Sequence, residues 1–439
     1  MTDAAAHRPT VGIYGYCASA ADTFGGVESH LSHLARALVA AGWRVVVHCL
    51  SAPGAGWHVA DGEFRVGPRT REVSADLVEF VPAHGPGLTG AVAENVAASV
   101  RYAEQTILVF GTRDGWVFDV ALAAAEELGL PAVSLVYFTA EERWYRAQFT
   151  SRSRSIAGLA DAIERAALDT RGVATLRDVI ERSALVVVPT DYVKGQLAAL
   201  VEPPDATRIV TVYHGVDPEL FARRDRPWGP DGAWLHVSRL SVPFAAHKNV
   251  AWSCEFLRAM VDLDPPPRLT ICGSGDATGL IGDFATQNGL DARVTVGGFM
   301  DQPRLAAQMR VASLLLVPSM MEAGCTVIVE AVLSGCLPLV LDHAGSGEVM
   351  RSLGLGAFLV TPSTRDLGGG ARTVVPEISH AREVVEFAYA HPEQVRRLLD
   401  AAADIAGQRF GIDATTRLLC EHLRRRNLLD VDTERAVRQ

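Results

Sequence analysis

Short apolar runs rich in β-branched residues alternate along the whole chain with longer segments whose apolar positions recur with helical periodicity. The short runs predict strands and the periodic segments predict amphipathic helices. Strands that alternate with helices in this way indicate an α/β protein, with parallel sheets covered by helices on both faces. The predicted strands are Thr10–Tyr14, Arg44–Cys49, Thr106–Phe110, Ala132–Val136, Ala184–Val188, Arg208–Tyr213, Trp234–Val237, Arg268–Cys272, Arg293–Val296, Leu314–Val317 and Leu337–Leu341.

The alternating pattern runs twice, which predicts two Rossmann-like, doubly wound domains. Residues 218–232 lie between the two runs, are charged and rich in Pro and Gly, and have no apolar period, so they are predicted to form a linker. The N-terminal domain is therefore expected over residues 1–217 and the C-terminal domain over 233–409. Residues 366–372, with three consecutive glycines, predict a surface loop.

Composition narrows the possible functions. The chain has 439 residues, with 41 basic and 51 acidic side chains and a formal net charge of -10, which argues against nucleic acid or an anionic membrane as a general partner. No apolar run is long enough for a membrane span, so no integral membrane contact is expected. The start of the chain does not resemble a secretory signal. The 7 cysteines are scattered without a CxxC pair, as in a cytoplasmic protein with reduced thiols and no metal site.

The most informative motif is SMMEAGCTVIVEAVLSG, which follows the predicted strand Leu314–Val317. Glu322 lies in the loop, Gly324, Cys325 and Thr326 lead into a helix, and Glu330 lies about two turns into that helix. The free N–H groups at such a helix start suit an anionic ligand. Glu322 is equally compatible with a simple first-turn acid. Glu330 stands in an otherwise apolar run, so we expect its carboxylate to be buried and to have a partner.

A second motif, LHVSRLSVPFAAHKN, places two cations after the predicted strand Trp234–Val237. Arg239 offers a planar fork and Lys248 a point charge, a combination that suits a diphosphate. The chain has only two lysines, Lys194 and Lys248, which favours a specific contact for Lys248. The alternative is a solvated pair at the rim of the sheet.

Glycines follow two other strands. Gly25 and Gly26, just before Glu28, allow close approach of a ligand to the backbone, and Glu28 can cap the helix that follows. Gly273 begins a GSG turn, which is a weaker signal and is often only a tight turn. The spacing does not match the dinucleotide-binding fingerprint. The basic run Arg424–Arg426 is interpreted as a solvated helix face.

Taken together, these residues resemble glycosyltransferase family 4, the retaining transferases of GT-B fold, over most of the chain. The paired glutamates Glu322 and Glu330, which have seven residues between them in a strand–loop–helix setting, are the most specific part of the resemblance. The other matching pieces are Gly25–Glu28, Gly215–Asp217, Arg239, Lys248, Asn249, Gly273, Gly275, Pro318, Ser319, Gly335, Pro338 and Gly345–Glu348.

The resemblance implies a retaining, metal-independent transfer of a sugar, of hexosyltransferase type, from a nucleoside-diphosphate donor to a hydroxyl acceptor in a bacterial cytoplasm. It implies a UDP-, GDP-, ADP- or TDP-sugar as substrate and no cofactor. The acceptor would bind the N-terminal domain, to which a final helix of about residues 410–439 would return, and the donor would bind the C-terminal domain. A small-molecule or oligosaccharide acceptor, such as a soluble specialised metabolite, is expected, and no oligomeric state is predicted.

The implied roles fall on particular residues. Arg239 and Lys248 would bind the diphosphate, Glu322 the transferred sugar, and Glu330 the ribose hydroxyls. Backbone amides of Gly324, Cys325 and Thr326, with Gly273, would meet donor oxygens, and Gly25 and Gly26 would approach the diphosphate from the other domain.

One departure concerns the acceptor and sugar side, where many family members carry a His and this chain has Phe138 and Thr139. Glu28, Thr139, Glu141 and His214 are the candidates there, with His214 also readable as a packed hinge residue. Two alternatives stay open: a nucleotide-sugar 2-epimerase of the same fold, and a degenerate, non-catalytic sugar-binding subunit.

Overall fold

The structure is a computed structural model that describes residues 170–223, 228–368 and 371–428, together with parts of residues 1–137. Within residues 1–137 it describes strands β1 to β9, residues 129–137 and helical positions 34, 38, 118, 122, 125 and 126. Each predicted strand is present, and its ends differ from the prediction by two residues at most.

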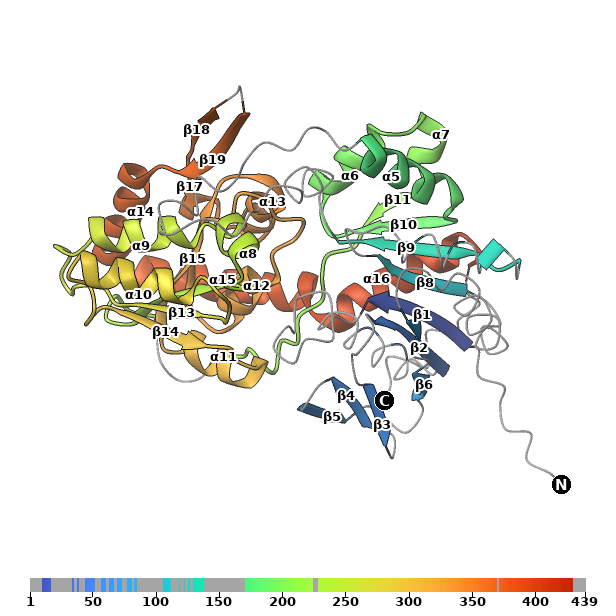
Figure 1. Ribbon diagram of the computed structural model, residues 1–439, viewed down its shortest axis with the longest axis horizontal. Coiled ribbons are helices and arrows are strands. Elements are labelled where there is room, and N and C mark those ends of the chain that lie inside the picture. The colour runs from blue at the N-terminus through green and yellow to red at the C-terminus, as the bar shows by residue number, and fades with distance from the viewer. Residues whose placement is uncertain are drawn as a thin grey trace. The chain divides into compact units, whose positions relative to one another are not determined.

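The first sheet is parallel and contains the strands predicted for the first half of the chain (Figure 1). Its strand order is β11-β10-β9-β8-β1-β2-β6, with β7 also paired to β2. A small antiparallel sheet of β3 (Trp57–Ala60), β4 (Glu63–Val66) and β5 (Arg69–Glu72) was not predicted. The main strands are β1 (Thr10–Tyr16), β2 (Arg44–Ser51), β6 (Leu77–Phe80), β7 (Ala83–His84), β8 (Thr106–Gly111), β9 (Ala132–Val136), β10 (Leu185–Val188) and β11 (Ile209–Thr211).

The second sheet is also parallel and has the order β14-β13-β12-β15-β16-β17. Its first strand, β12, therefore lies in the middle, and the chain fills one side of it before crossing to the other. At such a switch point the loops after two neighbouring strands diverge and leave a crevice at their carboxyl ends. Here those strands are β12 and β15. The strands are β12 (Ala233–Val237), β13 (Leu269–Cys272), β14 (Val294–Gly298), β15 (Ala312–Val317), β16 (Leu337–Leu341) and β17 (Leu359–Val360).

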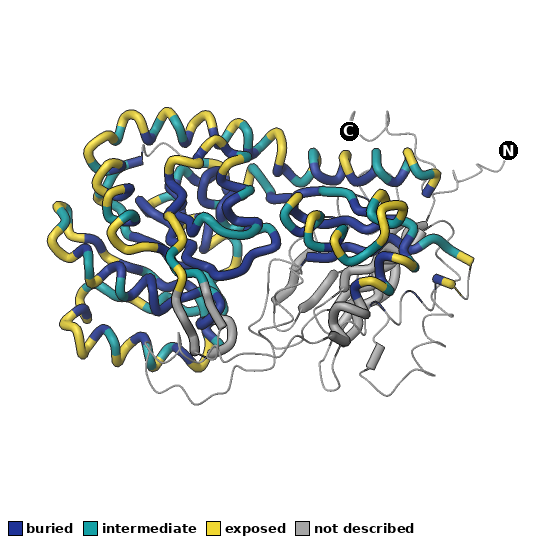
Figure 2. Tube along the Cα trace, turned by 90° about the horizontal axis from the view of Figure 1, so that it is seen from above, coloured by how far each residue is buried: buried dark blue, intermediate teal, exposed yellow. Residues whose placement is uncertain are grey.

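Helices cover both sheets, as the alternating sequence pattern requires. Every residue of β9, β10, β15 and β16 is buried, which explains why these strands are continuously apolar. In Figure 2 the buried residues gather in the interior of the second unit and exposed residues lie along its outside, while the edge strand β14 is only partly buried. The helices are α5 (Thr170–Arg182), α6 (Asp191–Ala198), α7 (Pro203–Ala206), α8 (Val242–His247), α9 (Val250–Ala259), α10 (Thr278–Gln287), α11 (Gln302–Met309), α12 (Thr326–Leu333), α13 (Ala344–Ser352), the 3₁₀ turn η2 (Gly356–Phe358), α14 (Ile378–Ala390), α15 (Pro392–Phe410) and α16 (Ile412–Arg425).

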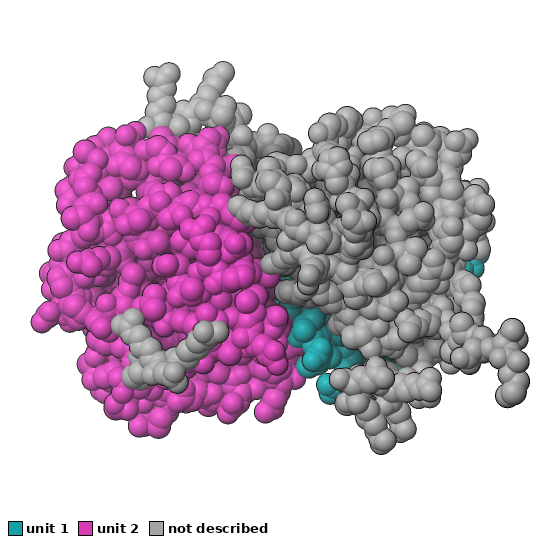
Figure 3. Space-filling view, turned by 90° about the horizontal axis from the view of Figure 1, so that it is seen from below, with its two compact units in different colours: residues 1–140, 170–215, 412–439 teal, residues 141–169, 216–411 magenta. Residues whose placement is uncertain are grey.

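The chain divides into two compact units (Figure 3). Described residues of the first unit fall within 1–140, 170–215 and 412–439, and those of the second within 216–411. Helix α16 belongs to the first unit and α15 to the second, so the chain changes unit at Gly411. No helix in the described part of the chain is long and apolar enough to cross a membrane.

Two segments differ from their predicted character. The described part of 218–232 is packed onto the second unit: Phe221 and Trp228 are buried, and the Trp228 indole donates to the Ser313 carbonyl at 2.7 Å. Burial of these two aromatic side chains stabilises the packed position, although the segment is rich in Pro, Gly and charged residues. The described residues of the predicted loop 366–372 belong to an antiparallel hairpin of β18 (Pro362–Gly368) and β19 (Ala371–Pro376), in which Gly368 is paired with Ala371.

The turn after β13 is held tightly against the loop after β12. The Leu240 amide donates to the Ser274 carbonyl at 2.9 Å, which extends the sheet beyond both strands. A Cβ on Gly273 would stand 1.8 Å from the Ser238 oxygen, and one on Gly275 would stand 2.1 Å from the Leu240 carbonyl carbon. The backbone angle φ is +154° at Gly273 and +153° at Gly275. The GSG turn is therefore required by backbone packing, whatever it contributes to a ligand.

Replacing Gly273 by Ala is expected to lower the free energy of unfolding by about 2 kcal/mol or more, because the new methyl group overlaps backbone that cannot move independently. Gly282 in α10 is the matched control, since a Cβ there meets nothing within 4 Å. Gly282→Ala should raise stability by about 0.5–1 kcal/mol. Urea titration of the full chain measures both changes, and equal effects of the two substitutions would contradict the packing argument.

Candidate active site

The charged residues that the sequence singled out follow β12 and β15, the two strands at the switch point of the second sheet. Arg239 and Lys248 follow β12, while Glu322 follows the neighbouring strand β15 and precedes α12. Lys248 and Glu322, which are 74 positions apart in the chain, thus follow two neighbouring strands. Arg239 is half-buried in its loop.

Lys248 and Glu322 form an ion pair, in which Nζ of Lys248 donates to Oε1 of Glu322. Their side chains are 25% and 10% exposed. Burial works to raise the pKa of Glu322, but the charges of Lys248 and His247 and hydrogen bonds from Lys248 and Ser319 outweigh it. The pKa of Glu322 therefore lies below its usual value, so this carboxylate is ionised at neutral pH.

Two sets of contacts fix the Glu322 loop. The Met320 amide donates to the His247 carbonyl at 3.1 Å, and the His247 imidazole donates through Nε2 to the Met321 carbonyl. On the other side, the Gly345 amide donates to the Glu322 carbonyl at 2.9 Å. A Cβ on Gly345 would lie 2.2 Å from the Ala323 oxygen, so only glycine permits this approach. His247 is a positioning residue that the sequence reasoning missed.

The long spacing between Arg239 and Lys248 contains a short helix, α8. Lys248 follows α8 directly, and Asn249 then adopts the left-handed conformation with φ 54° before α9 begins. Asn tolerates this conformation better than most residues, and its side-chain oxygen caps α9 by accepting from the Trp252 amide at 3.4 Å. The sharp reversal at Asn249 leaves Lys248 facing the Glu322 loop.

Glu330 behaves differently from the expectation of a buried and partnered carboxylate. Burial raises its pKa to about 7, yet the side chain is only half-buried. Within the part of the chain that the structure describes, no hydrogen bond or ion pair engages this carboxylate. Cys325 lies near both glutamates, and burial, followed by the charge of Glu322, raises the pKa of its thiol well above the usual range.

The start of α12 has no side-chain cap. Cys325 occupies the N-cap position, and among the described residues no side-chain oxygen caps the amide of Thr326, while the Ile328 amide donates to the Cys325 carbonyl at 3.2 Å. Gly324 and Cys325 lie between Glu322 and these amides. The arrangement brings together a carboxylate and a helix N-terminus that follow β15 and an ammonium that follows the neighbouring strand β12.

His236 on β12 is a further buried residue that the sequence reasoning missed. Its ring bonds to the Ser253 hydroxyl at 2.9 Å and to the Ser238 hydroxyl at 3.0 Å. Burial, assisted by the charge of Lys248, lowers the pKa of His236 to about 3. This neutral imidazole connects α9 to the end of β12, next to Arg239. A His within the apolar strand AWLHV was the signal that could have revealed it.

In the first unit, His214 is 9% exposed and packs edge-on against Tyr137, with ring centroids 4.3 Å apart. This geometry fits the interpretation of His214 as a packed hinge residue better than a role on the acceptor and sugar side. Gly25, Gly26, Glu28, Thr139 and Glu141 lie outside the described residues. No cluster of metal-ligating side chains occurs among the residues that the structure describes.

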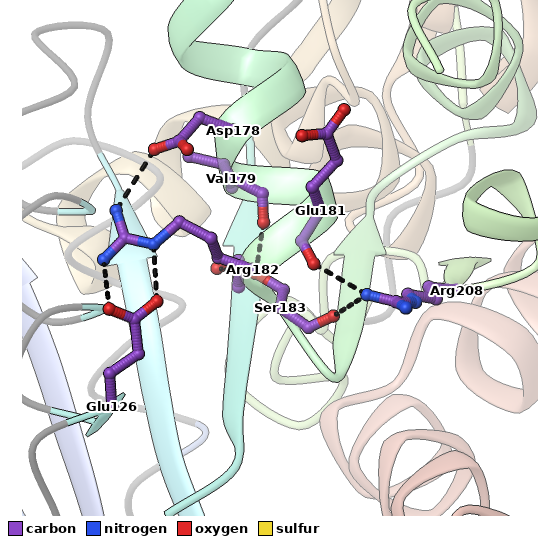
Figure 4. Close-up of polar contacts among 8 residues, drawn as sticks. Glu126, Asp178, Val179, Glu181, Arg182, Ser183 and Arg208 are labelled. Carbon is purple, nitrogen blue, oxygen red and sulfur yellow. Dashed lines mark hydrogen bonds and ion pairs between the residues drawn. The ribbon is translucent and has the colours of Figure 1, made fainter. Parts of the chain in front are cut away.

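A surface pocket of the first unit lies at the amino ends of β9 and β10, where its lining includes Arg182, Arg208 and Glu126. Figure 4 shows these residues paired with one another or with carbonyls. Arg182 donates to the Glu126 carboxylate, and Arg208 donates to the Glu181 carbonyl at 2.7 Å. Ligands of doubly wound sheets bind at the carboxyl ends of the strands instead. This pocket therefore contributes nothing to the candidate active site.

Comparisons with protein families divide the chain into two matched parts. Residues 24–220 match the family model described as Glycosyltransferase Family 4, and residues 243–390 match the model described as Glycosyl transferases group 1. The second match contains Lys248, Glu322 and Glu330.

Individual relatives agree with these matches. A glycogen synthase of Mycobacterium tuberculosis is 26% identical over 80% of this chain and 81% of its own length. Among solved structures, the sucrose-phosphate synthase of Thermosynechococcus elongatus has a TM-score of 0.70 at 17% identity, covering 95% of this chain and 99% of that one. Anabaena HepE in complex with UDP-glucose has a TM-score of 0.66 at 16% identity, with 95% and 99% coverage.

Proposed function

Because the chain belongs to glycosyltransferase family 4 and has the GT-B fold of two Rossmann-like units, we propose that it moves a sugar with retention from a nucleoside-diphosphate donor to a hydroxyl acceptor. The observation that carries this proposal is the Lys248–Glu322 pair beside the uncapped start of α12. The chain is a glycosyltransferase, and the site proposed for its donor is the crevice after β12 and β15.

The diphosphate would bind Arg239, Lys248 and the first amides of α12. When the bond between the anomeric carbon and the phosphate oxygen breaks, its electron pair remains on the diphosphate. Fixed cations and helix amides stabilise that charge without a metal ion. Lys248 would exchange part of its contact with Glu322 for the phosphate, which leaves the ionised Glu322 available to a sugar hydroxyl.

Glu330 would bind the ribose. A partly buried carboxylate that no described residue engages is well suited to accept two hydroxyl hydrogen bonds. Its raised pKa shows that burial without a partner disfavours the ionised form, and two O–H donors would remove that penalty. The neighbouring backbone of Gly324, Cys325 and Thr326 would meet sugar and phosphate oxygens.

Retention is proposed to follow from attack on the face of the sugar from which the diphosphate leaves. The acceptor hydroxyl forms the new bond to the anomeric carbon, and its proton passes to a departing phosphate oxygen, so that bonds and charges balance. Glu322 would orient the sugar through its hydroxyls. The acceptor, a soluble small molecule or oligosaccharide, would lie against the first unit.

The similarity to a structure that contains UDP-glucose favours a uridine nucleotide as the first donor to test. The purified full chain is incubated with UDP-, GDP-, ADP- and TDP-glucose, each alone and with a mixed acceptor panel, in buffer containing a metal chelator. Proton NMR follows the anomeric signals. We expect an α-linked product only when the acceptor is present, and its formation should not depend on added metal.

Three outcomes would contradict the proposal. A 2-epimerised donor in the absence of acceptor would identify an epimerase, a β-linked product would exclude retention, and absence of both transfer and nucleotide binding would indicate a degenerate subunit.

Arg239→Met in the same assay should reduce transfer by about 100-fold, because one cation at the leaving group is lost.

A further inference from the structure

Three polar side chains are hydrogen-bonded in series at the end of β12. The His236 ring lies between two hydroxyls, with Nδ1 2.9 Å from Oγ of Ser253 and Nε2 3.0 Å from Oγ of Ser238. His236 and Ser253 are 2% and 0% exposed, whereas Ser238 is half-buried. The series therefore runs from the core to a side chain that is partly open to solvent. Buried polar groups are costly to place in a core, so this arrangement calls for a physical reason.

The imidazole of His236 is neutral. Burial, assisted by the charge of Lys248, lowers its pKa to about 3. A neutral imidazole has one N–H group, which donates, and one bare nitrogen, which accepts. One of the two serine hydroxyls must therefore donate to the ring, and the other must accept from it.

Ser253 decides which of the two ring nitrogens carries the hydrogen. Among the described residues, the hydroxyl of Ser253 has Nδ1 of His236 as its only hydrogen-bond partner. If Nδ1 carried the hydrogen, the Ser253 hydroxyl would keep its own hydrogen in the core without an acceptor, which is unfavourable. With a bare Nδ1, Ser253 donates to the ring and both groups are satisfied. The ring hydrogen is then on Nε2, which donates to Ser238.

This tautomer leaves the hydroxyl hydrogen of Ser238 available. The oxygen of Ser238 accepts from the ring, and no described residue accepts from its hydroxyl. Ser238 is the first residue after β12 and directly precedes Arg239, and its amide still donates to the Cys272 carbonyl at 3.0 Å. The charge of Lys248 acts on the ring that holds this hydroxyl. The hydroxyl thus lies on the side of β12 where Lys248 lies, at the strand end proposed for the donor.

We propose that Ser238 donates its hydroxyl hydrogen to the diphosphate of the sugar donor, and that His236 is the positioning residue that directs it there. The inference rests on the proposed function, because it adds a residue to the same donor site. Ser238 supplies a fixed dipole beside the two cations, Arg239 and Lys248. A hydroxyl that is already oriented stabilises the charge of the leaving diphosphate without reorganising during the reaction.

The first test removes the hydroxyl alone. In the full chain, Ser238→Ala should weaken UDP binding by about 10-fold in calorimetry, because a hydrogen bond to a charged phosphate is lost. Uridine is the matched ligand, since it has no phosphate and should bind Ser238→Ala and the wild type alike in an NMR titration. Ser379→Ala is the matched variant: it removes an exposed hydroxyl of the same unit, which donates to Glu377 at 2.8 Å, and should leave UDP binding unchanged.

The second test concerns His236. An Asn side chain can replace Nδ1 and keep the contact with Ser253, whereas the longer Gln side chain can place an N–H group where Nε2 lies. We therefore expect His236→Asn to weaken UDP binding by about threefold to tenfold and His236→Gln to stay within about twofold of the wild type. In the Ser238→Ala background, neither substitution should weaken UDP binding further, because the residue through which His236 acts is gone.

Several results would overturn the inference. Unchanged UDP affinity in Ser238→Ala would do so, as would an equal loss of affinity for uridine. Equal effects of His236→Asn and His236→Gln, or effects that persist in the Ser238→Ala background, would show that His236 acts only through the stability of the core. Urea unfolding identifies any His236 variant that fails to fold, and Ser238→Ala tests the phosphate contact without a change in the core.

Arg239→Met separates failure of this inference from failure of the proposed function. If the wild type binds no nucleoside diphosphate, or if Arg239→Met binds UDP as tightly as the wild type, the proposed donor site and this inference both fall. If Arg239→Met weakens UDP binding while Ser238→Ala does not, the proposed function stands and only the role of Ser238 and His236 is excluded.

Discussion

Lys248→Met is expected to reduce turnover by about 100-fold and also to destabilise the second unit. In the proposed mechanism, turnover falls because a fixed cation is removed from the place where the leaving diphosphate would gather charge. The loss of stability has a different origin, because Glu322 would remain ionised and largely buried without its partner. Removing one member of such a pair costs about 3 kcal/mol, towards the lower end of the range for buried pairs since Lys248 is partly exposed.

A double variant separates the two effects. Lys248→Met/Glu322→Gln removes both charges, so its free energy of unfolding should return to within about 1 kcal/mol of the wild type while turnover stays low. Arg258→Met is the control for losing an ordinary ion pair, because its pair with Glu255 is exposed and should be worth less than about 1 kcal/mol. Steady-state kinetics and urea unfolding provide the two measurements. Recovery of turnover in the double variant would show that Lys248 acts only on Glu322.

Glu330→Gln is expected to make the ligand-free protein more stable at high pH and to weaken nucleotide binding. The pKa of Glu330 is raised from 4.5 to about 7 in the folded protein, so between these values the folded state binds more protons than the unfolded state. Stability from this group is therefore fully present below about pH 4.5 and is lost as pH rises through about 7. Above that pH the ionised carboxylate costs up to about 3 kcal/mol, which Glu330→Gln should recover.

Nucleotide affinity should follow the opposite trend. The ionised carboxylate is the better acceptor for the ribose hydroxyls, so UDP should bind the wild type more tightly as pH rises from about 6 to about 8. Glu330→Gln should bind about 10-fold to 100-fold more weakly at the upper end of this range. A 2′,3′-dideoxy analogue of UDP is the matched ligand, because without the hydroxyls it should bind both proteins alike. Calorimetry that found the same loss for this analogue would exclude the ribose contact.

The sequence determined the elements and most of the candidate residues. Runs such as those of β15 and β16 are apolar throughout because both faces of a parallel strand are covered, so strand positions followed from local pattern alone. Arg239 and Glu322 stood out because they lie in loops after predicted strands, where charged residues for binding are common, and Lys248 stood out because it is one of only two lysines.

Only the tertiary structure decided how these residues act. That Lys248 meets Glu322 depends on β12 and β15 being neighbours, and strand order is a non-local property that no periodicity encodes. The packing of residues 218–232 onto the second unit, the supporting contacts of His247 and His236, and the glycine requirement beside Ser238 likewise arise from segments far apart in the chain. That no described residue pairs with the Glu330 carboxylate is likewise visible only in the tertiary structure, because it depends on which side chains the fold brings near it.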